Sequence, residues 1–428
     1  MQAMMRQASR GARGSFAAAV RSGKTRRWNS TVAAVDAVAN QTRGVVEVAW
    51  EDGHKSEFLP VWLKDHDPAT IHPTSLQRQR DTAELDPETP VPNSVKVEEG
   101  GRKLRLEWQG EEPVIFDTNW LRENGYANGQ HKGPKPNAIG SRVTWKASDM
   151  PKESVMRFSS SDILNDDAVL ADCLEAILRS GLVFISDMPK SMDETEAICR
   201  RLGPVRETFY GAMWDTAPKQ EGEVNDTAYT KDALHTHSDT SYLIDSAGLQ
   251  LFNCVAQSGS NDSLVEGTGE PEGATKLVDG FKVAEVLREK EPETFEFFCK
   301  HALKWHCIED GVFVKAWAPV FSFLPGTDEI VQFRYNSYDL SPVNYLPPDV
   351  LRDYYRHTKV INEYIRSPEY ISYMRLNVGE MVVIDNHRVF HGRTAFTGYR
   401  NMVGCYIGVD DWQSKLRNLR GGAPLVVD

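Results

Sequence analysis

The stretch Met381-Val-Val-Ile-Asp-Asn-His-Arg-Val-Phe-His-Gly-Arg393, read together with the upstream stretch Leu234-His-Thr-His-Ser-Asp239, decides the fold. His237 and Asp239 are two residues apart, so on an extended segment their side chains point to the same face. His391 can join them from a strand that is distant in sequence but adjacent in a closed barrel. Two histidines and a carboxylate in this order form the facial triad that leaves half of a non-haem iron(II) open to other ligands. The pattern predicts an enzyme with a metal centre.

The H-x-D spacing alone is weak evidence, because matches of this length are frequent by chance. In the alternative interpretation, His237 and Asp239 cap a turn and His391 is a core histidine. His235 adds an ambiguity, since His235 and His237 also form a metal-like pair. The H-x-D geometry favours His237 as the ligand and leaves His235 behind it or exposed.

A basic residue at the start of the next predicted strand strengthens the metal hypothesis. Arg400 and Tyr406 fall on one face of the segment 400–406, and His391 precedes that segment across the turn 397–399. We therefore expect Arg400 and His391 on neighbouring strands beside one cavity. An inward guanidinium needs a planar anion, and its fork binds a carboxylate through two hydrogen bonds. The distal carboxylate of 2-oxoglutarate meets this need, and its keto-acid end would chelate the iron.

Arg400 also admits a structural interpretation, in which it pairs with Asp385 or Asp410 at the rim of the fold. Aromatic residues near the motif are open to two interpretations as well. Those concerned are Tyr210, Trp214, Tyr229 and Tyr406. Convergent rings of this kind can bind a quaternary ammonium through their electron-rich faces. Core packing is the alternative, and spacing does not decide between the two.

Composition bounds the class of protein. The 428 residues suffice for two domains, and an apolar content of 40% with a charged content of 26% is ordinary for a soluble globular protein. The net charge of −12 argues against nucleic-acid binding. No run of about 18 apolar residues is present that would span a membrane. The six cysteines are scattered without C-x-x-C pairs, which fits a reducing compartment better than a disulfide framework or a zinc site.

The N-terminus departs from this acidic balance. Residues 1–35 contain seven basic residues and no acidic residue, and Ser, Ala and Gly are frequent among them. Such a segment is typical of a mitochondrial transit peptide, here with cleavage near residues 27–30, and indicates the mitochondrial matrix. A disordered basic tail is the alternative.

Residues 36–123 are expected to form a small antiparallel β domain. Alternating apolar residues predict strands around Val46, Val95, Leu104 and Val114, and the apolar pattern that resumes at Phe58 continues through Leu63. Residues 124–150 are rich in Gly, Pro, Asn and Lys, which predicts a linker.

Residues 151–428 are expected to form the catalytic domain. Helices are predicted at 166–180, after the capping box that begins at Ser191, at 282–290 and at 349–366. Buried or strand-like runs lie at 182–185, 249–255, 275–278, 330–335, 381–384 and 401–407, and 256–273 is predicted to be a long exposed loop. The fold class is therefore mainly β with flanking helices, a double-stranded β-helix of the jelly-roll kind.

From about residue 157 to 419 the chain resembles the carnitine-pathway 2-oxoglutarate dioxygenases, which act on trimethyl-lysine or γ-butyrobetaine. The motifs that carry the resemblance are Asp226-Thr-Ala-Tyr-Thr-Lys231, His237-Ser-Asp-Thr-Ser-Tyr242, Leu277-Val-Asp-Gly-Phe281, Arg334-Tyr-Asn-Ser-Tyr338, Ile384-Asp-Asn-His-Arg-Val-Phe-His-Gly-Arg393 and Phe396-Thr-Gly-Tyr-Arg400. The first and last of these are more similar to the trimethyl-lysine enzymes. The small β domain also fits, through Trp62-Leu-Lys-Asp65 and His72-Pro-Thr-Ser-Leu-Gln-Arg78.

The resemblance implies a role for each candidate residue. His237, Asp239 and His391 would bind Fe(II), while Arg400 and Thr275 would hold 2-oxoglutarate, with Asn336 close to it. The substrate residues would be an aromatic cage and a nearby carboxylate: Tyr210, Trp214, Tyr229, Tyr406 and Asp226. O2 is the oxidant and ascorbate the reductant of such enzymes.

The resemblance also implies a reaction and partners. The expected reaction is hydroxylation of N6,N6,N6-trimethyl-lysine to 3-hydroxy-trimethyl-lysine, the first step of carnitine biosynthesis. γ-Butyrobetaine hydroxylation is the first alternative, and a non-catalytic betaine-binding jelly-roll protein is a remote one. The expected partners are a small quaternary-ammonium substrate and a second copy of the chain in a homodimer, with neither nucleic acid nor membrane.

Two features depart from the family. Relatives often carry a cysteine-rich zinc site in the N-terminal domain, whereas residues 65–72 contain no cysteine. We therefore expect no structural zinc, although His66 and His72 leave a weak alternative. The loop 256–273 is also longer than in relatives.

Overall fold

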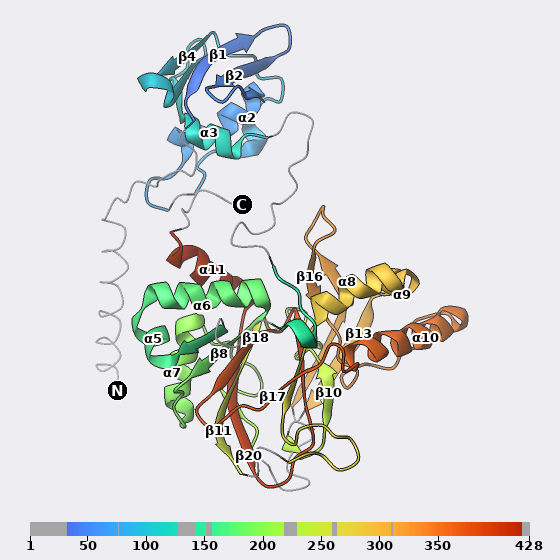
Figure 1. Ribbon diagram of the computed structural model, residues 1–428. Helices are drawn as coiled ribbons and strands as arrows, with labels where there is room; N and C mark the ends of the chain where they lie inside the picture. The colour runs from blue at the N-terminus through green and yellow to red at the C-terminus, as the bar shows by residue number, and fades with distance from the viewer. Residues whose placement is uncertain are drawn as a thin grey trace. The chain divides into compact units, whose positions relative to one another are not determined.

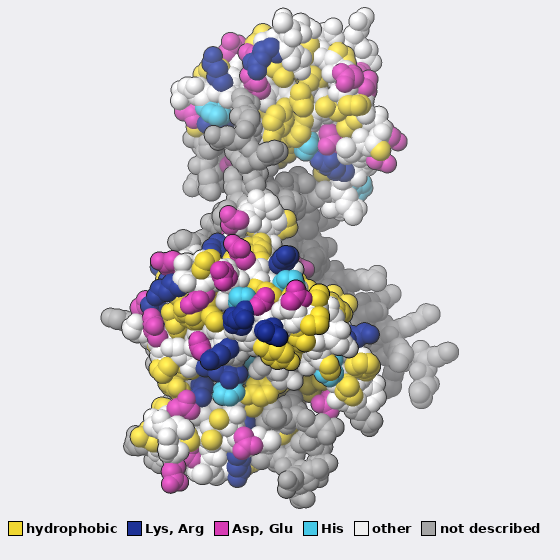
Figure 2. Space-filling model, turned by 90° about the vertical axis from the view of Figure 1, so that its right-hand side faces the viewer, with side chains coloured by type: hydrophobic (Ala, Val, Ile, Leu, Met, Phe, Trp, Pro, Cys, Tyr) yellow, Lys and Arg dark blue, Asp and Glu magenta, His cyan; other side chains and the backbone are white. Residues whose placement is uncertain are grey.

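The computed structural model describes residues 32–75, 77–126, 142–150, 156–217, 229–258, 263–309 and 311–421 (Figure 1). Nearly all of the predicted transit peptide lies outside these residues. The chain divides into two compact units, the first spanning residues 1–132 with 423–427 and the second residues 133–422 with 428. No described helix is both long and apolar enough to cross a membrane. On the face drawn in Figure 2, acidic, basic and apolar side chains are interspersed over both units.

The first unit contains two three-stranded antiparallel sheets. Their strands are β1 (Ala34–Asn40), β2 (Val45–Trp50) and β3 (Lys55–Phe58), then β4 (Ser94–Glu98), β5 (Lys103–Glu107) and β6 (Val114–Asp117). The helical segments are α2 (Pro60–Asp65), η1 (Pro68–Thr70), η2 (Thr82–Glu84), η3 (Glu99–Gly101) and α3 (Thr118–Asn124). Apolar residues of both sheets share one core. The predicted small antiparallel β domain is confirmed.

One local prediction in this unit is wrong. Leu63 does not continue the strand pattern of Phe58 but lies in helix α2, with its side chain buried. Pro60 occupies the first helical turn, where its fixed φ favours a helix and its missing N–H costs nothing. His66 and His72, the alternative zinc ligands, have other partners. His66 Nε2 lies 2.9 Å from a guanidinium nitrogen of Arg78, and His72 Nδ1 accepts backbone N–H groups at 3.1 and 3.3 Å.

Two facing sheets form the core of the second unit. The six-stranded sheet has the order β7 (Arg157–Ser159), β8 (Leu182–Ser186), β18 (Met381–Asp385), β11 (Leu249–Gln257), β20 (Arg400–Ile407) and β9 (Trp214–Asp215). The four-stranded sheet has the order β10 (Leu234–His237), β19 (Val389–Arg393), β12 (Thr275–Asp279) and β17 (Ser372–Met374). All neighbouring strands are antiparallel except β7 and β8. The predicted double-stranded β-helix is confirmed.

Helices cover the outer faces of this core (Figure 1). The helices α5 (Ser160–Asn165), α6 (Asp167–Ser180), α7 (Met192–Leu202) and α11 (Val409–Leu419) pack on the six-stranded sheet. The rest of the unit consists of η4 (Ala147–Asp149), α8 (Gly280–Lys290), α9 (Pro292–Lys300), α10 (Pro348–Ile365), and the hairpins β13 (Leu303–Glu309) with β14 (Val312–Ala318) and β15 (Phe321–Phe323) with β16 (Ile330–Phe333). Ser191 is the N-cap of α7, since its Oγ accepts from the N–H of Glu194, which is one of the two bonds of the predicted capping box.

A buried ion pair ties the turn between β18 and β19 to the rest of the second unit. Arg388 and Asp279 are each 1% exposed, and a guanidinium nitrogen of Arg388 lies 2.7 Å from Asp279 Oδ2. Arg388 also donates to the carbonyls of Val143 and Arg179. Asp279 caps α8 and accepts from the N–H of Trp145 at 3.1 Å. Part of the predicted linker thus packs in the core of this unit.

We expect Asp279→Asn to lower the free energy of unfolding by about 3–5 kcal/mol, because it leaves the buried Arg388 guanidinium without its counter-charge. The amide keeps the shape and the cap of the carboxylate, so the change isolates the charge. Urea unfolding of the full chain measures the loss. Asp353→Asn, which removes the solvent-exposed partner of Arg356, is the matched control and should cost less than about 1 kcal/mol. Equal losses in the two variants would contradict the assignment.

Candidate metal centre and its pocket

Three potential metal ligands meet between the two sheets. His237 is the last residue of β10 and pairs with His391 of β19, while Asp239 follows in the turn after β10. The ligand atoms of the three side chains lie within 4.8 Å of one another. Asp239 Oδ1 is 3.1 Å from His237 Nε2 and 3.9 Å from His391 Nε2. The structure therefore brings together the three residues of the predicted triad.

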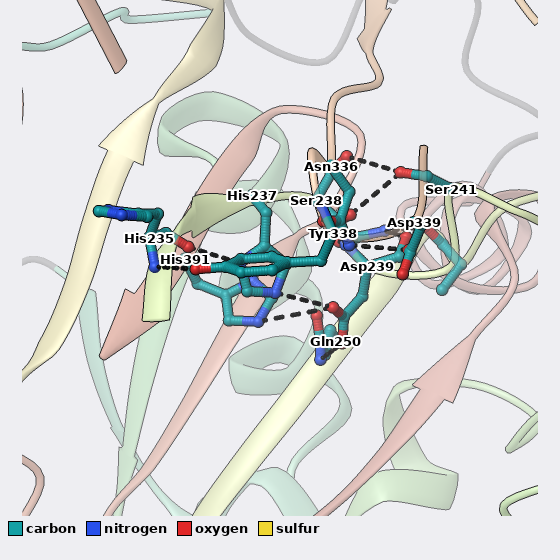
Figure 3. A network of polar contacts seen from close by, with 12 residues as sticks. His235, His237, Ser238, Asp239, Ser241, Gln250, Asn336, Tyr338, Asp339 and His391 are labelled. Atoms are coloured by element: carbon teal, nitrogen blue, oxygen red, sulfur yellow. Dashed lines mark hydrogen bonds and ion pairs between the residues drawn. The ribbon is translucent and has the colours of Figure 1, made fainter. Parts of the chain in front are cut away.

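The Asp239 carboxylate is held in one orientation. Asn386 clamps its backbone, because Asn386 Oδ1 accepts from the Asp239 N–H at 2.8 Å and Nδ2 donates to the Asp239 carbonyl at 3.0 Å. Oδ2 of Asp239 accepts from Gln250 Nε2 at 2.5 Å and from the Tyr406 hydroxyl at 3.0 Å. Figure 3 shows His237, His391 and Gln250 converging on this carboxylate. Two donors on Oδ2 leave Oδ1 facing the histidines.

The protonation states of the triad suit a cation. His237 Nδ1 lies 2.7 Å from the His235 carbonyl, so it carries the proton and leaves the Nε2 lone pair for a metal. Burial lowers the pKa of His391 to about 3, which keeps that imidazole neutral. Burial alone would raise the pKa of Asp239, but the two imidazoles and the Gln250 amide hold it below its usual range. The Asp239 carboxylate outweighs the effect of burial and raises the pKa of His237, so a metal ion would compete with a proton at that imidazole. Two imidazoles and one carboxylate match the donor set of an open non-haem iron site.

A pocket of about 450 Å³ opens over the triad and draws its walls from both sheets. Ten of the eleven predicted site residues line it: His237, Asp239, His391, Arg400, Thr275, Asn336, Tyr210, Trp214, Tyr229 and Tyr406. Asp226 lies outside the described residues. The side chain of His235 points away from the triad in Figure 3, and only its carbonyl contacts His237. Apart from Asp226, the predicted residues thus share one cavity, although their roles stay a prediction.

Arg400 is buried in the pocket wall without a carboxylate. Its side chain donates to Thr275 Oγ1 at 3.3 Å, and no described carboxylate lies within 4.0 Å of the guanidinium. Burial lowers the pKa of Arg400 to about 10, so the group remains charged near neutral pH. The alternative partners lie elsewhere: Asp385 accepts from the N–H of His387, and Asp410 is in the first turn of α11. A buried cation of this kind fits an anionic ligand.

The predicted relation between Arg400 and His391 needs a correction. Arg400 begins β20 of the six-stranded sheet, whereas His391 lies in β19 of the four-stranded sheet. The chain crosses from one sheet to the other between them, so the two strands are consecutive without being hydrogen-bonded neighbours. Both side chains still face the same pocket, from opposite walls.

One region of the pocket is aromatic. The rings of Trp214 and Tyr406 are 5.7 Å apart, and the hydroxyls of Tyr210 and Tyr242 lie 3.5 Å from each other. Trp214 pairs with Gly404 across β9 and β20, and a Cβ at Gly404 would come within 2.3 Å of the indole. The missing side chain therefore lets the indole lie against β20. Ring faces in such a pocket can bind a cation that has no N–H group.

The sequence did not single out several residues that shape this pocket. Gln250 and Asn386 orient Asp239, while Tyr338 and Asp339 line the wall beyond the histidines. Asn386 lies inside the metal motif, and this position was a signal that it belongs to the site. Its contact with Asp239 was not predicted. Gln250 is a buried amide in the apolar strand β11, which could have marked it as a functional residue, because an amide there needs a partner. Tyr338 ends the family motif 334–338, whereas Asp339 carries no comparable signal.

The chain matches known proteins over most of its length. The family model "Taurine catabolism dioxygenase TauD, TfdA family" matches residues 146–406. The chain is 35% identical to the mitochondrial trimethyllysine dioxygenase of Homo sapiens, over 83% of this chain and 80% of that protein. It is 33% identical to that of Gallus gallus, over 90% and 88%. It is 26% identical to the γ-butyrobetaine dioxygenase of Pseudomonas sp. (strain AK-1), over 87% and 92%.

We expect Asp239→Ala to abolish binding of Mn(II), used as a redox-stable probe, and Gln250→Leu to weaken it by about 10–100-fold, because the carboxylate loses its orienting donor. Calorimetric titration of each purified variant measures both effects. His235→Ala is the matched control and should bind Mn(II) like the unmodified chain, since only the backbone of that residue contacts His237. Loss of binding in His235→Ala with retention in Asp239→Ala would reverse the ligand assignment.

Proposed function

This chain belongs to the taurine catabolism dioxygenase TauD, TfdA family, and we propose that it is an iron(II)- and 2-oxoglutarate-dependent dioxygenase that hydroxylates trimethyl-lysine at its β-carbon. One observation carries the proposal: an aromatic region and a buried Arg400 cation share a pocket with an ordered His-Asp-His group. The names of the relatives from Homo sapiens and Gallus gallus support the same reaction.

His237, Asp239 and His391 would hold the iron, and Arg400 with Thr275 would bind the distal carboxylate of 2-oxoglutarate. An iron(II) ion held by such a triad couples the decarboxylation of 2-oxoglutarate to the hydroxylation of a C–H bond by O2, with ascorbate keeping it reduced. Arg400 can make two hydrogen bonds to a carboxylate, and this fork fixes the co-substrate in one direction. Phe252, whose ring lies 5.0 Å from that of His391, contributes an apolar wall beside the triad.

The aromatic residues Tyr210, Trp214, Tyr229 and Tyr406 would hold the trimethylammonium group. This cation cannot donate a hydrogen bond, so its recognition depends on ring faces, each worth about 0.5–2 kcal/mol. With the trimethylammonium group held by the rings and the co-substrate held by Arg400, the substrate chain would lie near the triad. Holding the reacting groups in this way is the protein's own contribution to the rate.

Two other functions remain as outcomes of the test. The Pseudomonas relative is named for γ-butyrobetaine, which carries the same trimethylammonium group. A non-catalytic betaine-binding protein would have no use for a carboxylate oriented by Asn386, Gln250 and Tyr406 toward two histidines. We further propose a mitochondrial matrix location, supported by the basic N-terminal segment and by the relatives' names, and a homodimer, which light scattering can test.

We expect Arg400→Lys to raise the KM for 2-oxoglutarate by at least about tenfold, because lysine keeps the charge and loses the two-pronged geometry. Succinate release at varied 2-oxoglutarate measures this change. Arg420→Lys, at an exposed arginine that pairs with Asp172 and Glu175 on the helical face, is the control and should leave the KM unchanged. An unchanged KM in Arg400→Lys would return Arg400 to a structural role.

We expect the unmodified chain to prefer trimethyl-lysine over γ-butyrobetaine by at least about tenfold in kcat/KM, a difference of about 1.4 kcal/mol. Trp214→Ala should raise the KM for trimethyl-lysine strongly, while 2-oxoglutarate turnover uncoupled from hydroxylation persists, because the triad is intact. Iron-dependent succinate release and product formation with both substrates give these values. A preference for γ-butyrobetaine would assign the sister activity, and no turnover of either would favour the binding protein.

A further inference from the structure

Trimethyl-lysine carries a second cation, its α-ammonium group, which is not the group assigned to the aromatic residues. In this molecule the quaternary nitrogen is separated from the reacting β-carbon by three methylene groups, whereas the α-carbon with its ammonium and carboxylate is directly bonded to it. When the trimethylammonium group lies among the rings and the β-carbon lies over the triad, the amino-acid end must lie against a part of the pocket wall within reach of the triad. A residue that binds the α-ammonium is therefore needed close to the metal ligands.

That wall offers carboxylates. Among the described residues, three acidic side chains line the pocket besides the metal ligand: Asp215, Glu309 and Asp339. Asp215 directly follows Trp214 and thus belongs to the aromatic region. Glu309 is the last residue of the hairpin strand β13. Asp339 lies in the segment after β16 that also supplies Asn336 and Tyr338, and these three residues, labelled in Figure 3, line the same pocket as Asp239.

Asp339 is held in place from several sides. Its Oδ2 accepts from Asn336 Nδ2 at 2.8 Å, and its carbonyl accepts from the His306 N–H at 2.9 Å. Asn336 is itself fixed, since it is 4% exposed and its Oδ1 accepts from the Tyr338 N–H at 3.0 Å. The Trp305 indole donates to the Asn336 carbonyl at 3.2 Å. Asn336, expected near the co-substrate, thus also orients a carboxylate, and orientation in advance of binding lowers the entropy that a ligand loses.

The ring of Tyr338 places this carboxylate beside the triad. It meets the His237 ring edge-on with centroids 5.9 Å apart, and its hydroxyl accepts from the His235 N–H at 3.0 Å. Asp339 directly follows Tyr338, and both residues line the pocket that opens over the triad. The α-ammonium nitrogen is two bonds away from the reacting β-carbon, so it can reach this carboxylate.

We propose that Asp339, oriented by Asn336, binds the α-ammonium of trimethyl-lysine and so sets the preference for this substrate over γ-butyrobetaine. The inference rests on the proposed function. A charge-assisted hydrogen bond from an ammonium to an oriented carboxylate is stronger than a neutral one. γ-Butyrobetaine has no α-ammonium, and its own carboxylate would approach the like charge of Asp339. The same residue therefore attracts one substrate and repels the other.

The test compares Asp339→Asn with the unmodified chain on three substrates: trimethyl-lysine, its des-amino analogue 6-(trimethylammonio)hexanoate, and γ-butyrobetaine. We expect kcat/KM for trimethyl-lysine to fall at least about tenfold, and kcat/KM for the des-amino analogue to change less than about twofold. The value for γ-butyrobetaine should stay or rise. The KM for 2-oxoglutarate and the affinity for Mn(II) should not change, which also shows that the variant is folded.

Glu309→Gln is the matched control, because it removes another carboxylate of the same pocket, and it should change kcat/KM for trimethyl-lysine less than about threefold. A second measurement needs no variant: the unmodified chain should turn over the des-amino analogue at least about tenfold less efficiently than trimethyl-lysine. Equal loss on trimethyl-lysine and on the analogue in Asp339→Asn would overturn the inference, as would an unmodified chain that does not distinguish them. Failure of the unmodified chain to hydroxylate trimethyl-lysine at all would overturn the proposed function itself.

Discussion

The buried ion pair between Arg388 and Asp279 is the constraint on which the site depends. Arg388 lies in the turn between β18 and β19, and its charge can remain in the interior only while Asp279 balances it. The same turn contributes Asn386, which clamps the backbone of Asp239, and leads directly into His391. One electrostatic requirement therefore fixes a metal ligand and the support of a second ligand. The ion pair also connects Trp145 and the start of α8, because Asp279 accepts from the Trp145 N–H and caps that helix.

Tyr406 connects the metal ligands with the aromatic region. Its hydroxyl donates to Asp239, and its ring lies 5.7 Å from that of Trp214. A ligand that displaces this ring would also disturb a hydrogen bond to the triad. Gly404, two residues earlier on the same strand, makes room for the indole. Three residues on one face of β20 thus serve the proposed reaction in different ways. Arg400 would bind the anionic co-substrate, Gly404 leaves space for an aromatic ring, and Tyr406 donates a hydrogen bond to a metal ligand.

The sequence predicted β18 and β20, which precede and follow the His391 segment in the chain, from their apolar runs, and it predicted the triad from its characteristic ligand spacing. It did not predict the hairpin β13–β14, in which Ile308, Phe313 and Trp317 are exposed although they are apolar. Pattern-based reasoning expects such residues to be buried and cannot see that they face outward. It placed Arg400 and His391 on paired strands, since a short turn usually joins neighbours and does not reveal a change of sheet. Asp339 could not be found at all, because the role proposed for it depends on its hydrogen bond with Asn336 and on its position in the pocket wall.

The support that the triad receives from both sheets has a thermodynamic consequence. His237 and His391 belong to the four-stranded sheet, whereas the donors that orient Asp239, Gln250 and Tyr406, belong to the six-stranded sheet. An ion bound by all three ligands would fix Asp239 in the orientation that accepts these two hydrogen bonds, so its binding free energy would stabilise the packing of one sheet on the other. At a free metal concentration of one hundred times Kd, mass action adds about 2.7 kcal/mol to the free energy of unfolding. The supply of metal in the surroundings would then govern how long the folded chain persists, as well as whether it can react.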